Sequence, residues 1–219
     1  MSAEILINAS THEARAAIVE NGVLQEVYLE RSSRRGLISN IYKGRVSRVL
    51  PGMQAAFIEI GMERTAFLHA SDIFDPRHAD TGIEAPRTEN IRALVAEGHE
   101  ILVQVVKDPL GTKGARLTTY ITLPSRFLVY MPQGHGVGVS ARIEHESERE
   151  RLRSAVLAGL ETRENAGFIV RTAAEDAPAE ALRADMLYLR KLWEFVSQKG
   201  LRTGAGNLVH ADQIGRAHV

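Results

Sequence analysis

The sequence predicts an α+β protein, in which a small barrel of short strands is followed by a region that contains two longer helices. Three observations predict this fold class. Within residues 40–73, two apolar runs are broken by the turn signals Pro51-Gly52 and Gly61-Met62. A long charged insertion then precedes a further strand at 100–107. After Pro124, apolar residues recur at the three- and four-residue spacing of helices.

Composition excludes several classes of site. The 219 residues have a formal net charge of zero, so overall charge indicates no partner. The chain has no cysteine, which excludes disulfides and thiolate metal sites and fits a reducing cytosol. The eight histidines show no pair at ligand spacing, so no zinc site is expected. No run reaches the ~18 apolar residues of a membrane span, and no signal peptide is seen. We therefore expect a cytoplasmic protein without a membrane partner.

Positive charge is concentrated in one stretch of the chain. Residues 31–48 contain no acid and carry Arg31, Arg34, Arg35, Lys43, Arg45 and Arg48. Such a local basic patch in a neutral protein favours contact with a polyanion.

The first part of the chain is expected to form short strands at 5–7, 14–20 and 23–30. Asn21-Gly22, between the last two apolar runs, is a strong hairpin signal. A few strands cannot close a core without further partners, so we expect exposed apolar surface here and poor solubility. A polar joint at 32–36 follows.

The middle of the chain is predicted to form a five-stranded barrel of the OB type. Its strands are short, and one long connection at 74–98 separates the third from the fourth. That connection is expected to hold a short helix at 88–96. The strand at 100–107 is followed by a turn at 108–114 and a strand at 115–123.

The last part combines strands and helices. We expect a strand at 126–131, a glycine-rich loop at 132–138, a helix at 143–160, a strand at 167–171 and a helix at 178–199. Trp193 lies on the apolar stripe of the second helix, so it is interpreted as a packing anchor rather than a binding group.

Alternation within the barrel strands predicts which side chains face the core, because residues i and i+2 of a strand share a face. The predicted core face carries Ala56, Ile58, Ile60, Ala66 and Leu68. Phe57 shares the other face with Glu59, and Phe67 shares it with His69. A carboxylate is seldom buried, so both rings are expected on the outside.

Phe57 and Phe67, with Lys43 and Arg45 on the preceding strand, form a predicted stacking platform beside cations. This arrangement suits single-stranded nucleic acid, because every base offers a π-face and every nucleotide a phosphate. The alternative is that one or both rings pack under a neighbouring domain.

Lys113 lies between two glycines in the turn at 108–114. The turn lacks the first glycine of a phosphate loop, which argues against a nucleoside triphosphate site. Two interpretations of Lys113 stay open: a contact to a backbone phosphate, and a plain exposed turn lysine.

Arg171 and Thr172 offer a guanidinium fork and a hydroxyl at the end of a strand. These groups suit a terminal phosphate, which accepts bidentate hydrogen bonds. The alternative is that Thr172 forms a capping box with Glu175, and that Arg171 makes an ordinary salt bridge.

Five motifs resemble the ribonuclease E/G family, in the family's order. They are Ile41-Tyr-Lys-Gly-Arg-Val, Met53-Gln-Ala-Ala-Phe, the run 105–119, Leu128-Val-Tyr-Met-Pro and Phe168-Ile-Val-Arg-Thr-Ala-Ala-Glu. The resemblance implies an S1-type RNA-binding OB-fold barrel at 37–120 and a 5′-sensor α/β subdomain at 121–200. Both are inserted into an incomplete RNase H-like domain, formed by residues 1–36 and 201–219.

The family resemblance implies a single-strand-specific endoribonuclease that prefers a 5′-monophosphate end, with precursor ribosomal RNA and messenger RNA as partners. The family's RNA contacts in the barrel fall on Phe57, Phe67 and Lys113, and a further RNA-contacting arginine falls on Arg142. The positions of the barrel contacts agree with the predicted outer face of the barrel.

The family's 5′-phosphate contacts fall on Arg171 and Thr172, with Val129 lining the pocket. Ser125 departs from the family pattern, because related members have glycine there. A contact through the backbone would survive this change, but the pocket would be slightly reshaped.

The resemblance implies that the catalytic machinery lies outside this chain. In the family, paired aspartates hold the Mg²⁺ that activates water, and cysteines form a zinc link that joins the subunits of a homo-oligomer. We therefore expect no catalytic residue, no metal ligand, no RNA cleavage and a monomeric state for this chain alone. Residues 214–219 do not resemble the family and are interpreted as a foreign tail.

Two alternative functions of the chain stay open. One is a stand-alone, non-catalytic RNA-binding regulatory module, and the other is a structural piece of a ribosome-associated protein.

Overall fold

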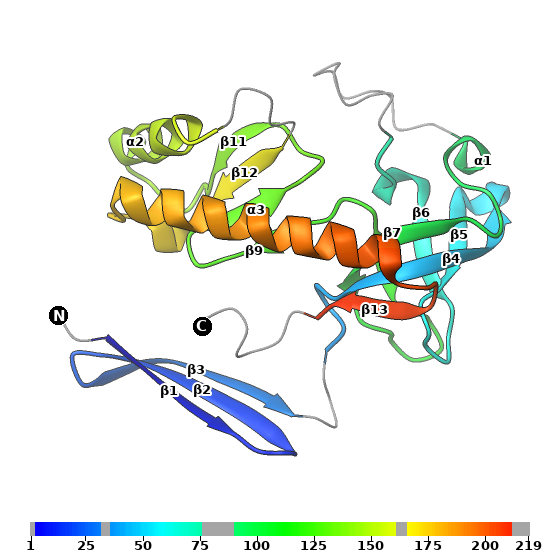
Figure 1. Cartoon of the computed structure of the whole chain (residues 1–219), viewed down its shortest axis with the longest axis horizontal. Helices are drawn as coiled ribbons and strands as arrows, with labels where there is room; N and C mark the ends of the chain where they lie inside the picture. Colours follow the sequence, from blue (N-terminus) through cyan, green and yellow to red (C-terminus); the bar gives the residue numbers. More distant parts are fainter. Residues whose placement is uncertain (1–2, 32–35, 76–89, 161–165, 212–219) are drawn as a thin grey trace.

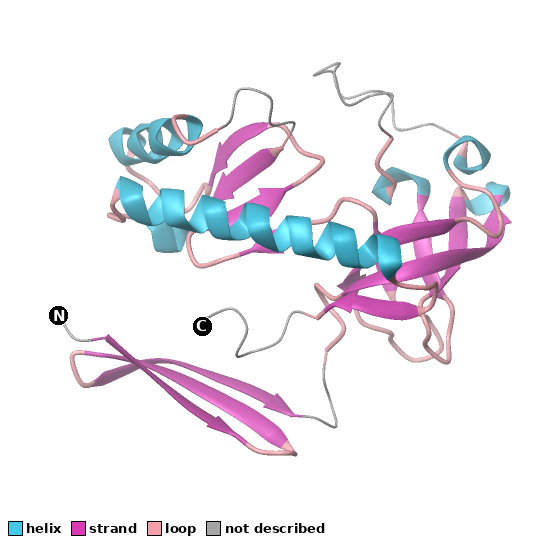
Figure 2. Cartoon of the chain, in the orientation of Figure 1, coloured by secondary structure: helices cyan, strands magenta, loops and turns pink. Residues whose placement is uncertain are grey.

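The computed structural model describes residues 3–31, 36–75, 90–160 and 166–211. Within these ranges the chain is an α+β protein with three β-sheets and one long helix (Figure 1). Figure 2 shows that helix running from the four-stranded sheet to the barrel, while the N-terminal strands form a separate layer. No helix in the described ranges is long and apolar enough to cross a membrane.

The N-terminal sheet is an antiparallel meander. Its strands are β1 (Ala3–Ala9), β2 (Glu13–Glu20) and β3 (Val23–Arg31). Asn21 and Gly22 have φ values of 51° and 77°, which is the conformation that an Asn-Gly hairpin turn requires. The three predicted strands and their turn are therefore confirmed.

This sheet leaves most of its apolar side chains in water. Those more than 40% exposed are Ile5, Leu6, Ile7, Val23, Leu24, Val27 and Leu29. Among the described residues, no other strand pairs with the sheet. The expectation of exposed apolar surface is confirmed, and poor solubility stays a prediction.

The barrel is closed by five strands. They are β4 (Ile41–Leu50), β5 (Ala55–Glu59), β6 (Ala66–His69), β7 (Glu100–Lys107) and β8 (Arg116–Thr118). Their order is β4-β5-β6-β8-β7, and β7 pairs with β4 to complete the ring. The pair β6–β8 is parallel and the others are antiparallel. The predicted OB-type barrel is confirmed.

Short 3₁₀ turns and one helical turn connect these strands. They are η2 (Pro51–Met53), η3 (Ala70–Asp72) and α1 (Ile91–Leu94). α1 is shorter than the helix expected at 88–96. It begins at Asn90, whose side chain accepts a hydrogen bond of 3.1 Å from the Arg92 N–H. Part of the expected helix, 88–89, lies outside the described residues.

The last third of the chain forms an α/β subdomain around a four-stranded sheet. Its strands are β9 (Leu123–Pro124), β10 (Leu128–Met131), β11 (Gly136–Val139) and β12 (Gly167–Val170), in the order β11-β12-β10-β9. Its helices are α2 (Glu146–Leu157), η5 (Thr172–Ala174) and α3 (Ala179–Arg202). As predicted, Trp193 packs against the core of this subdomain and is partly buried.

One prediction for this region is wrong. Residues 136–139 form the edge strand β11, parallel to β12, instead of continuing a glycine-rich loop. Glycines at 136 and 138 weaken the local strand signal. Pairing with the buried strand β12 and cover from α2 decide the conformation, and neither is visible in local sequence.

The strand β13 (Asn207–His210) follows α3 and pairs with β4 of the barrel. Gln104 adds a buried polar link at the other side of β4. Its amide donates to the carbonyls of Ser39 (3.0 Å) and Thr122 (2.9 Å), where the chain enters and leaves the barrel. The domain boundaries at 36, 120 and 200 stay predictions, and the foreign tail at 214–219 lies outside the described residues.

The ion pair between Glu148 and Arg151 links α2 to the segment that follows η5. The Glu148 carboxylate accepts from Arg151 at 2.6 and 2.7 Å and from the Asp176 N–H at 3.0 Å. Arg151 also donates to the Ala177 carbonyl at 3.0 Å. The hydrogen bonds from Arg151 lower the pKa of Glu148 from 4.5 to about 2.

Gly44 provides a first test of barrel packing. A Cβ at this position would lie 2.4 Å from Cγ2 of Ile58, which is fully buried. We expect Gly44→Ala to lower the free energy of unfolding by about 1–3 kcal/mol through overpacking. Urea denaturation measures this change. The matched control is Gly52→Ala, because no atom lies within 4 Å of its added Cβ. Equal stability of the two variants would contradict this packing.

The Glu148–Arg151 pair predicts a pH-dependent contribution to stability. The pKa of Glu148 is lower in the folded chain, so its contribution is complete above about pH 4.5 and is lost as the pH falls toward about 2. Glu148→Gln should lower the melting temperature at pH 7, with a difference from the parent that shrinks below pH 4.5. Glu150→Gln is the control, since the Glu150 side chain is 62% exposed. A difference that is constant with pH would refute the assignment.

Candidate nucleic-acid interface

The two phenylalanines lie side by side on the outside of the barrel. Phe57 and Phe67 are direct partners in the antiparallel β5–β6 ladder, and both are half-buried. All five residues of the predicted core face are buried, namely Ala56, Ile58, Ile60, Ala66 and Leu68. The predicted division into a core face and an outer face is confirmed, and neither ring is sealed in the barrel interior.

Arginines from the two neighbouring strands flank this pair of rings. Exposed Arg48 on β4 is the ladder partner of Phe57, and exposed Arg116 on β8 is the ladder partner of Phe67. The Asp72 carboxylate orients Arg116, because it accepts from Nε at 3.1 Å and from Nη2 at 2.9 Å. Neither arginine was a sequence candidate for the site. Arg48 belongs to the basic patch that the sequence shows at residues 31–48. The position of Arg116 depends on the parallel pairing of β6 with β8, which local sequence does not predict.

The two predicted cations of β4 lie farther along that strand. Arg45 is opposite Glu59 on β5 and Glu100 on β7, and its Nη2 is 3.2 Å from Oε1 of Glu100. Lys43 is half-buried and lies where β4 pairs with β13. Arg48, rather than Lys43 or Arg45, is therefore the ladder partner of Phe57 on β4.

The turn that carries Lys113 is held against the edge of β6. A Cβ on Gly114 would lie 1.9 Å from the Thr65 carbonyl oxygen, so only glycine allows this approach. The Phe67 N–H donates to the Ala115 carbonyl at 2.8 Å. Lys113 is exposed, and these contacts bring it to the strand that carries Phe67.

A third ring continues the outer face of β6. The ring centroids of His69 and Phe67 are 6.5 Å apart. The Nδ1 atom of His69 accepts a hydrogen bond of 3.2 Å from the Ser71 N–H and lies 2.8 Å from the Ser71 hydroxyl. The imidazole is therefore held through Nδ1 beside the Phe67 ring.

Arg171 and Thr172 follow β12 directly, as predicted. Arg171 is exposed, its N–H donates to the Phe127 carbonyl at 2.8 Å, and its guanidinium donates to the Ser125 carbonyl. No side chain caps the 3₁₀ turn that begins at Thr172, so the alternative of a capping box with Glu175 is wrong. In the described part of the chain, no carboxylate lies within ion-pair distance of Arg171.

Val129 lies on the four-stranded sheet, and Arg142 lies in a turn that follows one of its strands. Val129 is half-buried and pairs with Ile169, two residues before Arg171. Arg142 is exposed in the turn between β11 and α2, which begins with a 2.9 Å hydrogen bond from the Ser140 N–H to the Val170 carbonyl. Because β11 and β12 are parallel, this turn and Arg171 lie at the same edge of the sheet.

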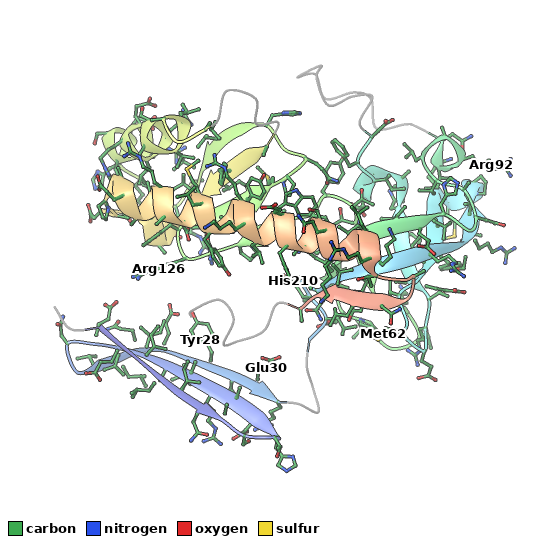
Figure 3. All side chains as sticks on the ribbon, viewed as in Figure 1. Tyr28, Glu30, Met62, Arg92, Arg126 and His210 are labelled. Carbon is green, nitrogen blue, oxygen red and sulfur yellow. The ribbon has the colours of Figure 1, made fainter. Side chains whose placement is uncertain are left out.

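The N-terminal sheet approaches Arg171 through Tyr28. Figure 3 shows Tyr28 and Glu30 on the side of β3 that faces the rest of the chain. The hydrogen bond that the Tyr28 phenol donates to Glu26, together with burial, raises the pKa of Tyr28, while the Arg171 guanidinium acts in the opposite direction. The electrostatic effect of Arg171 therefore extends to β3.

The described residues do not fit a metal site. No group of three or more His, Asp or Glu side chains within the described ranges could hold a metal ion. The Mg²⁺ that the family resemblance implies has no matching donors there, so we derive no hydrolytic step from this chain.

Comparison with known proteins agrees with the family resemblance. Residues 122–217 match the model of the Ribonuclease E/G family. The chain is 54% identical to "Ribonuclease G" of Salmonella typhimurium and 53% identical to "Ribonuclease G" of Escherichia coli, in each case over 92% of this chain. It is also 42% identical to "Ribonuclease E" of a Nostoc species, over 94% of this chain.

The alignments cover only part of these relatives. The chain spans 41% of the length of the two ribonuclease G proteins and 29% of the Nostoc protein. The identity nevertheless runs through almost all of this chain, including the barrel and the α/β subdomain. The chain therefore belongs to the ribonuclease E/G family.

Proposed function

We propose that this chain is the RNA-binding and 5′-monophosphate-sensing part of a single-strand-specific endoribonuclease of its family. Its partners would be precursor ribosomal RNA and messenger RNA. The observation that carries the proposal is the Phe57–Phe67 pair, which stands on the outside of a closed barrel with Arg48 and Arg116 as ladder neighbours. Aromatic rings beside guanidinium groups suit unpaired bases and their phosphates.

The second element of the proposal is a site for the 5′-terminal phosphate. Arg171 and Thr172 contribute a guanidinium and a hydroxyl, and Val129 lines the pocket beside them. In the described chain only one guanidinium nitrogen of Arg171 has a hydrogen-bond acceptor, the Ser125 carbonyl. Its remaining donors can therefore bind a phosphate in the bidentate mode. Arg142, at the same edge of the sheet, contacts the RNA chain that leads away.

The remaining family features are part of the same proposal. Residues 1–36 and 201–219 belong to an RNase H-like domain, the barrel at 37–120 is S1-type, and the segment at 121–200 is the 5′ sensor. Hydrolysis uses Mg²⁺ on residues outside this chain, and the chain alone binds RNA without cutting it. The Phe57–Phe67 pair beside Arg48 and Arg116 equally supports the second candidate, a non-catalytic RNA-binding regulatory module. Mg²⁺-dependent RNA cleavage by this chain would contradict both.

The stacking platform predicts how affinity depends on its rings. Phe57→Ala and Phe67→Ala should each weaken binding of a single-stranded oligoribonucleotide by about 1–3 kcal/mol, because each removes a surface on which a base stacks. The loss should be equal for RNA with a 5′-monophosphate and with a 5′-hydroxyl. Fluorescence anisotropy measures both affinities. Phe195→Ala is the matched control, since that ring is 57% exposed and lies on α3 rather than on a barrel strand. A similar loss in the control would remove the support for a platform.

The phosphate site predicts a different pattern for Arg171. Arg171→Ala should abolish the preference for 5′-monophosphate RNA and leave affinity for 5′-hydroxyl RNA unchanged, because only the charged end is contacted. The ratio of the two dissociation constants is the readout. Arg92→Ala is the control, since Arg92 is exposed on α1 at the far end of the barrel (Figure 3). Equal loss for both RNAs would contradict a separate site for the terminus.

A further inference from the structure

A tight turn, Ser125–Leu128, joins β9 to β10 and lies directly beside Arg171. The Ser125 N–H donates to the Leu128 carbonyl at 2.8 Å, and the Ser125 hydroxyl oxygen lies 2.9 Å from the same carbonyl oxygen. Ser125 is a polar residue with only 8% of its surface exposed. Buried hydroxyls need hydrogen-bond partners, so this side chain belongs to the internal structure of the turn.

This turn holds Arg171 at two points. The Phe127 carbonyl accepts from the Arg171 N–H at 2.8 Å, and the Ser125 carbonyl accepts from the Arg171 guanidinium. A guanidinium binds phosphate through a planar fork, so its orientation matters as well as its charge. The conformation of the turn therefore sets the direction in which the free donors of Arg171 point.

Asp185 fixes the turn from outside. This residue lies on α3, and its Oδ2 atom accepts from the Ser125 hydroxyl at 2.5 Å, the Phe127 N–H at 3.0 Å and the Leu128 N–H at 3.1 Å. Hydrogen bonds from three donors to one carboxylate oxygen are charge-assisted, and such bonds are stronger than bonds between neutral groups. Without the carboxylate, the two N–H groups would lose their acceptor in a part-buried position.

We propose that Asp185 is a positioning residue for the 5′-phosphate site, acting on Arg171 through the Ser125–Leu128 turn. The Ser125 hydroxyl is the link that a glycine at this position could not supply. With serine the turn is held to α3 through a side chain as well as through backbone N–H groups. The proposal rests on the proposed function of Arg171, and it assigns no contact between Asp185 and RNA.

The test compares affinities for one oligoribonucleotide that carries either a 5′-monophosphate or a 5′-hydroxyl, measured with the full chain. Asp185→Ala should lower the preference for monophosphate roughly tenfold, because charge-assisted hydrogen bonds that orient Arg171 are lost. Affinity for the 5′-hydroxyl RNA should not change, since the barrel platform is intact. Asp185→Asn should restore part of the preference, because its amide oxygen still accepts hydrogen bonds.

Further variants separate positioning from general destabilisation. Ser125→Ala and Ser125→Gly keep the backbone N–H donors and should lower the preference less than Asp185→Ala does. If Asp185→Ala fails to fold, the preference for monophosphate is measured with the two Ser125 variants and with Asp185→Asn instead. Glu194→Ala is the matched control, because this exposed acid of α3 accepts hydrogen bonds from Ser197 and Gln198 of its own helix and, among the described residues, from no other element.

Two results would overturn the proposal, and they differ. If Arg171→Ala abolishes the preference while the Asp185 and Ser125 variants fold and keep it in full, Asp185 has no positioning role and the phosphate site stands. If the parent chain shows no preference, or Arg171→Ala keeps it, the proposed function of Arg171 fails and the inference fails with it.

Discussion

The pairing of β4 is the constraint on which the rest of the structure depends. This single strand pairs with β5 and β7 to close the barrel, and also with β13. Its Gly44 leaves the space that Ile58 and Val103 fill in the barrel core. Because β13 continues from α3, the same strand ties the α/β subdomain to the barrel. Gly61 and Gly206 support this junction, where an added Cβ on Gly61 would lie 1.9 Å from the Gly206 carbonyl oxygen.

Local sequence pattern predicts the features that depend on the nearest neighbours along the chain. Alternation in β5 and β6 separates core from surface because strand geometry is regular, and it identifies Phe57 and Phe67 as outward-facing. Asn21-Gly22 predicts its hairpin because both residues tolerate positive φ. The helical repeat that contains Leu182 and Met186 predicts α3, since that repeat covers a buried face.

Features that depend on distant partners could not be predicted in this way. The 136–139 strand forms because β12 offers it a ladder, against the local preference of its glycines. Arg116 becomes a neighbour of Phe67 only through the parallel β6–β8 pairing, which joins segments about fifty residues apart. Asp185 reads as an ordinary polar position of a surface helix, yet it contacts a turn sixty residues earlier. In each case a contact between residues far apart in the sequence determines the local structure or the neighbour of the side chain.

The helix α3 connects the two proposed RNA contacts in a way that bears on selectivity. Asp185 holds the turn beside Arg171, while Gly200 packs on Leu102 of the barrel strand β7. Fifteen residues of helix separate these points by about 22 Å, and a helix does not stretch. In the proposed function, a strand whose unpaired bases are held by the platform would present its 5′ terminus to Arg171 at a limited effective concentration. The second contact would then be intramolecular and would add affinity without a larger interface. Such binding at two sites would require a strand that is flexible between them, which would favour single-stranded RNA over a stiff duplex.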